Sequence, residues 1–67
     1  MITIKFNNEN ISLPLKATII NFLQEINNSG NGIAVAVNEI VITKSDWDKK
    51  QLKNNDNVLV IKATQGG

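Results

Sequence analysis

The sequence predicts one small α+β domain, a four- to five-stranded sheet with one main helix packed on one face. Apolar and polar residues alternate at the start of the chain, as in half-buried strands. Residues 19–26 follow the helical period instead, and residues 58–61 are apolar on both sides, as a central strand tends to be. With 67 residues, the domain is near the lower size limit for folding on a core alone.

A β-hairpin is predicted at the start of the chain. Residues 2–6 and 11–15 both alternate between apolar and polar side chains. The cluster at residues 7–10 favours a turn, because Asn tolerates positive φ and bonds its own backbone. Pro14 cannot donate to a strand ladder, so we expect the second strand at a sheet edge.

The predicted helix begins at Thr18, a residue type that caps helix N-termini well. Asn21 stands where a capping box would have Glu or Gln. The Asn- and Gly-rich segment 27–32 is expected to end the helix. The apolar stripe of the predicted helix consists of Ile19, Phe22, Leu23 and Ile26.

Three further strands are predicted after the helix. Residues 33–37 have one bulky and one small face, and Asn38–Glu39 is a tight-turn candidate leading into residues 40–42. Residues 54–57 form another turn before the last strand, at residues 58–61.

The polar segment 44–52 predicts a loop or a short 3₁₀ turn. Trp47 within it either caps the core or anchors a partner, since Trp is enriched at binding hot spots. A single short helix covers one face of the sheet. The other face is then either an exposed apolar surface for a partner or is covered by segment 44–52.

Composition argues against several function classes. The chain has no Cys and no His, which removes thiolate zinc sites, cysteine nucleophiles and the commonest general base. We therefore expect a protein that is not an enzyme and binds no metal. The net charge of +1, with dispersed lysines, gives no footprint for nucleic acid. The longest apolar run, residues 33–37, is too short to cross a membrane, and no signal-peptide pattern opens the chain. A soluble, intracellular protein is expected.

The sequence closes on Gly66–Gly67. Glycine has no Cβ to prevent close approach, so such a tail can enter a narrow site and present its carboxylate. A frayed terminus is the alternative. The predicted organisation is a folded domain over residues 1–63 and a flexible tail over residues 64–67.

Several segments together match one known family pattern. They are the Asn-rich first hairpin, Thr18 with Ile19, Phe22 and Leu23, Val35 to Asn38, Ile40–Val41, Asp46–Trp47, Asp56 before residues 58–61, and Gly66–Gly67. On these residues, and over essentially its whole length, the chain resembles the ubiquitin-like β-grasp sulfur carriers, and most of all the ThiS family of thiamine biosynthesis. The resemblance implies a mixed β-grasp sheet.

The chain departs from the family pattern in two places. Thr43–Lys44 stands where the family often has Pro-Arg, so the positive charge is kept but the bidentate guanidinium is lost. Asn55 replaces a Gly in a turn whose left-handed conformation Asn can adopt.

The resemblance implies a carrier acted on by partner enzymes. A ThiF-like enzyme would use ATP to adenylate the carboxylate of Gly67, beside Gly66. Sulfur from a persulfide-bearing protein would then displace AMP and leave a thiocarboxylate. A ThiG-like thiazole synthase would accept that sulfur for the thiazole moiety of thiamine. The carrier itself would bind no cofactor.

The resemblance also implies how the sheet is used. The side chains expected to face the helix are Val35, Val37, Val58 and Val60. The expected partner-docking surface comprises Ala36, Leu59, Ile61 and Lys44. Two alternatives are a carrier of the molybdopterin-synthase small-subunit type and a β-grasp interaction module. We expect a monomer when free. Its expected location is a bacterial cytoplasm or a plastid stroma. The Ile-, Asn- and Lys-rich composition without Arg suggests an AT-rich genome, and plastid genomes are among these.

Overall fold

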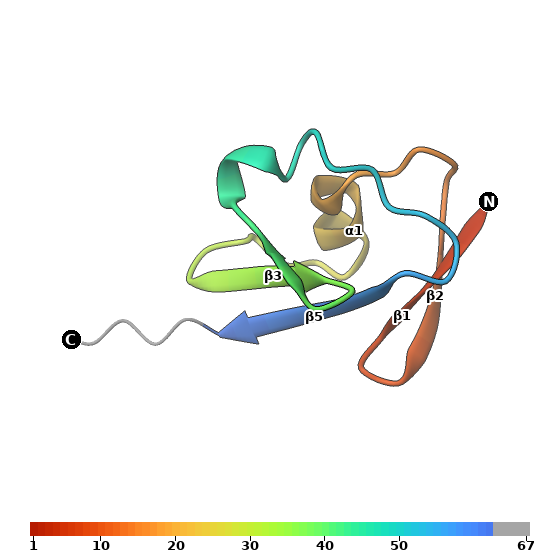
Figure 1. The fold of residues 1–67 in the computed structure, drawn as a ribbon, viewed down its shortest axis with the longest axis horizontal. Helices are drawn as coiled ribbons and strands as arrows, with labels where there is room; N and C mark the ends of the chain where they lie inside the picture. Colours follow the sequence, from red (N-terminus) through yellow and green to blue (C-terminus); the bar gives the residue numbers. More distant parts are fainter. Residues whose placement is uncertain (63–67) are drawn as a thin grey trace.

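The protein is built around a five-stranded sheet, as seen in the computed structural model, which describes residues 1–62 (Figure 1). The predicted tail at residues 64–67, with Gly66 and Gly67, lies outside the described residues. The elements in chain order are β1 (Ile2–Phe6), β2 (Glu9–Leu13), α1 (Ile19–Glu25), β3 (Ile33–Val37), β4 (Ile40–Ile42), the 3₁₀ turn η1 (Lys44–Asp46) and β5 (Asn57–Lys62).

The strands lie in the order β2-β1-β5-β3-β4. β5 pairs parallel with β1 and antiparallel with β3, and the two hairpin pairings are antiparallel. The sheet is therefore mixed. β5 occupies its centre, which confirms the prediction made from its two apolar sides.

The first hairpin has a tighter turn than the sequence predicts. Phe6 pairs with Glu9, so only Asn7 and Asn8 connect the strands, with φ of 51° and 63°. Positive φ at both positions is the type I′ geometry that matches strand twist. The prediction of a second strand at residues 11–15 is wrong at both ends. β2 is an edge strand, as expected, but Pro14 and the largely exposed Leu15 lie beyond it.

Helix α1 begins with a complete capping box. The backbone N–H of Thr18 donates to Asn21 Oδ1 at 2.9 Å, and the N–H of Asn21 donates to Thr18 Oγ1 at 3.4 Å. Asn thus performs the role usually taken by Glu or Gln. The predicted stripe is confirmed, since Ile19, Phe22 and Leu23 are buried and Ile26 packs against the core.

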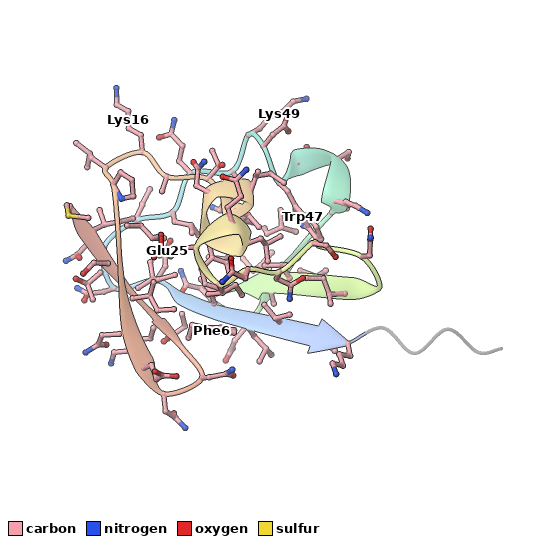
Figure 2. All side chains as sticks on the ribbon, turned by 180° about the vertical axis from the view of Figure 1, so that it is seen from behind. Phe6, Lys16, Glu25, Trp47 and Lys49 are labelled. Atoms are coloured by element: carbon pink, nitrogen blue, oxygen red, sulfur yellow. The ribbon has the colours of Figure 1, made fainter. Side chains whose placement is uncertain are left out.

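The core lies between α1 and one face of the sheet. The rings of Phe6 and Phe22 meet edge to face, with centroids 5.1 Å apart. Trp47 is 2% exposed, and its indole N–H donates to the carbonyl of Ile42 at 3.0 Å. Figure 2 shows Trp47 beside α1, and the N–H of Ile20 donates to its carbonyl. Trp47 therefore caps the core and is no exposed anchor.

A buried carboxylate joins the second hairpin to the start of β5. Asp56, 8% exposed, accepts hydrogen bonds from the Asn38 side chain at 3.0 Å and the Lys53 N–H at 2.8 Å. Asn38 Oδ1 in turn accepts from the N–H of Asn57 at 2.9 Å. Asn55 has φ of 72°, the left-handed conformation predicted for it. The turn before β5 is thus fixed by side-chain hydrogen bonds.

Candidate functional site: the open face of the sheet

The sheet has a second face that the helix does not cover. α1 and η1 lie on the same side of the sheet (Figure 1). Strand pairing places Ala36 between Val41 of β4 and Leu59 of β5, and Ala34 beside Ile61. These side chains alternate with the core residues of their strands and so point away from α1. We call this side the open face.

Three large apolar side chains on the open face are exposed. The exposed fractions are 61% for Val41, 53% for Leu59 and 43% for Ile61. They lie on β4 and β5, on either side of the small alanines of β3. Neighbouring exposed apolar side chains of this kind commonly mark a surface for a partner. We refer to Val41, Leu59 and Ile61 as the apolar patch.

The predicted docking residues are distributed unevenly over this face. Leu59 and Ile61 lie in the apolar patch. Ala36 lies on the same face but is only 4% exposed, because bulkier side chains flank it on both neighbouring strands. Its side chain therefore contributes little to the exposed surface of the open face. Val41 was not predicted, although its pairing with Ala36 across a tight turn would have placed it there.

The helix-facing set agrees with the expectation. Val35, Val37 and Val58 are at most 4% exposed in the core, and Val60 packs against it. The residues that alternate with this set along β3 and β5, such as Ala36, Leu59 and Ile61, therefore point to the open face.

Segment 44–52 does not cover the open face. It runs beside the start of α1, where the N–H of Leu52 donates to the carbonyl of Ala17 at 2.7 Å and Thr18 pairs with Gln51. Of the two alternatives for the second face, coverage by this segment is wrong, since Trp47 and Leu52 insert into the core on the helix side.

Lys44 lies apart from the apolar patch. It is the first residue of η1, the segment that follows β4 and lies on the same side of the sheet as α1 (Figure 1). Its Nζ is 5.8 Å from the centroid of the Trp47 ring, within range of a cation–π interaction. β4 and β5 both run antiparallel to β3, so Lys44 lies at the end of the sheet where β5 also ends.

The other end of the open face is hollowed. A depression of about 490 Å³ lies between the β1–β2 and β3–β4 turns, with Lys5 and Glu39 among its lining residues. Leu59 borders it as well, so the depression continues from the apolar patch. The open face thus combines the apolar patch near the end of β5 with a hollow near its start that both charged and apolar residues line.

Neither a metal-ion cluster nor a membrane-spanning helix is found within residues 1–62. No group of three or more His, Cys, Asp or Glu side chains in this range could hold a metal ion. Within the same range, none of the helices has the length and apolar character needed to cross a membrane. The candidate site is the open face, because it carries the exposed apolar patch.

Comparison with known proteins agrees with this geometry. The family model described as the ThiS family matches residues 3–67. A similar solved structure is the crystal structure of the thiamine biosynthesis protein ThiS from Geobacter metallireducens, with a TM-score of 0.83 and 16% sequence identity. The alignment covers 98% of this chain and 100% of that one, and shows that the fold is the ubiquitin-like β-grasp. No curated protein sequence gives a significant match. On the strength of the family match, which spans nearly the whole sequence, the chain belongs to the ThiS family.

Proposed function

We propose that this protein is the sulfur carrier of thiamine biosynthesis. The observation that carries the proposal is the family match, which runs through Gly66 to Gly67. The same match favours a thiamine carrier over one of the molybdopterin-synthase type. The described residues form a domain with an exposed apolar patch and hold no metal cluster. These features are consistent with a protein on which partner enzymes act.

The proposed chemistry takes place at the carboxylate of Gly67. A bare carboxylate is a poor acyl donor, and joining it to AMP supplies a good leaving group. A ThiF-like enzyme would form this adenylate from ATP. The terminal sulfur of a persulfide then bonds to the acyl carbon and displaces AMP, which leaves an acyl disulfide. A thiol reductant cleaves that disulfide to the thiocarboxylate, and a ThiG-like thiazole synthase takes sulfur from it. Glycine leaves the acyl carbon unhindered for each attack.

We propose that the open face docks these enzymes. Leu59 and Ile61 lie on β5, which ends at Lys62, so a partner on the apolar patch sits close to the point where the chain continues to residue 63. Lys44, at the same end of the sheet, offers a positive charge to that partner. The carrier would bind no cofactor, consume no ATP itself and be monomeric when free. It would act where its partners are, in a bacterial cytoplasm or a plastid stroma.

The test is activation by a ThiF-like enzyme and ATP, with trapping of the adenylate by hydroxylamine and mass spectrometry of the thiocarboxylate. The intact chain should exchange one carboxylate oxygen for sulfur. A chain that stops at Gly66 should not, because it presents its carboxylate one residue short. Equal thiocarboxylate formation by the truncated chain would refute the role of Gly67. A chain with both glycines that is never adenylated would instead favour an interaction module.

A further inference from the structure

The loop between α1 and β3 contains a reactive dipeptide, Asn31–Gly32. It is the one place in the sequence where Gly follows Asn. Asparagine is among the thermolabile residues of proteins. Its side-chain amide can be attacked by the backbone nitrogen of the next residue, and a following Gly offers no Cβ to obstruct that approach.

The structure leaves this dipeptide accessible. Both residues are exposed. Within residues 1–62 the side-chain amide of Asn31 makes no hydrogen bond, and its backbone N–H donates to Ser29 Oγ at 3.3 Å. A Cβ built on Gly32 would meet no atom within 4 Å, so the space around the attacking residue is open.

Four other asparagines are held more firmly. The side-chain oxygens of Asn21, Asn38 and Asn54 each accept a backbone hydrogen bond. Asn28 is half-buried and its Oδ1 accepts from the N–H of Gly30 at 2.8 Å. For these residues, the attack would first have to break an existing hydrogen bond. The attacking nitrogen would also belong to a residue whose Cβ obstructs the approach more than Gly does.

We infer that Asn31 is a site of spontaneous deamidation in the folded protein. The Gly32 nitrogen loses its proton to solvent base and bonds to the side-chain carbonyl carbon of Asn31, whose carbon–nitrogen bond breaks to release ammonia. The product is a five-membered succinimide. Water opens it at either carbonyl, which yields aspartate or isoaspartate. The reaction needs water and no oxidant or reductant.

The position gives the modification a structural consequence. Ile33 follows the dipeptide directly and pairs with Lys62, the last residue of β5. Isoaspartate inserts a methylene into the backbone and adds one negative charge, which lowers the formal net charge from +1 to neutral. Both changes occur at the end of the sheet where β5 ends.

The experiment is to incubate the intact protein in mildly alkaline and mildly acidic buffer and to map deamidation by tryptic peptide mass spectrometry. Cleavage after Lys16 and Lys44 places Asn31 in one peptide with Asn21, Asn27, Asn28 and Asn38 as internal references. We expect the acid-for-amide mass change to appear first at Asn31 and faster in alkali. An isoaspartyl methyltransferase should label the product.

Asn31→Gln is the matched control, because it keeps the amide and the charge but would need a less favourable six-membered ring. It should abolish the early product. Gly32→Ala is less suitable, since Gly32 has φ of 68° and a side chain there is strained. The inference is overturned if Asn28 or Asn38 reacts as fast as Asn31. It is equally overturned if Asn31 reacts only after the protein is unfolded by denaturant.

Discussion

The two faces of the sheet are built from the same strands but have opposite environments. On the helix side, Val35 and Val58 are nearly or fully buried beneath α1. On the open face, their neighbours Ala36 and Leu59 alternate with them, and the Leu59 side chain is half exposed. The helix side holds the fold together by burying apolar area. The apolar patch adds little to that core, so its apolar character is explained better by a partner than by stability.

The largest expected effect follows from removing a core ring on the helix side. Phe22→Ala deletes a fully buried side chain and its edge-to-face contact with Phe6. We expect a loss of about 3–5 kcal/mol in the free energy of unfolding, close to the whole stability of a domain this small. Urea titration followed by circular dichroism would measure it. A loss below about 1 kcal/mol would mean that the core does not lie where we place it.

A substitution on the open face should affect activation by a partner enzyme much more than stability. Leu59→Asp should change the free energy of unfolding by only about 1 kcal/mol or less, but reduce activation by a ThiF-like enzyme about tenfold or more. Leu15→Asp is the matched control, because Leu15 is 70% exposed in the loop after β2, away from the patch. Equal losses of activation in the two variants would contradict docking on the open face.

The smallest expected effect is a gain in stability at the turn between β3 and β4. Glu39 has φ of 72°, where a Cβ is strained, so Glu39→Gly should stabilise the fold by about 0.5–1 kcal/mol. The adjacent Asn38 also has positive φ, but its side chain bonds Asp56 and Asn57. Asn38→Gly should therefore destabilise by about 1–3 kcal/mol. Thermal melts of both variants would check this difference in sign.

Much of the fold could be predicted from local patterns. The period change at Thr18 located α1, and the apolar run at residues 33–37 correctly predicted strand β3. Each of these depends on a residue and its near neighbours in sequence. The same is true of Asn55, whose left-handed conformation follows from its own side chain.

What could not be predicted depends on pairing between strands. Two asparagines in the left-handed conformation form the first turn. Because this turn is so short, β2 begins at Glu9, earlier in the chain than predicted, and ends before Pro14. Ala36 is buried because Val41 and Leu59 flank it, and only the register reveals those neighbours. Single-strand alternation gives the face of a residue but not its exposure.

The central place of β5 also governs the order in which the sheet can form. Until β5 pairs, β1–β2 and β3–β4 are two separate hairpins with no shared strand. β5 joins them and closes contacts between distant parts of the chain, such as Lys5 with Asn57, which is the slow kind of step in folding. During synthesis both hairpins leave the ribosome before β5 does. The strand that completes the open face is thus the strand that leads to Gly66 and Gly67. If the open face docks an activating enzyme as proposed, a chain in which β5 has not yet paired lacks the assembled surface for that docking.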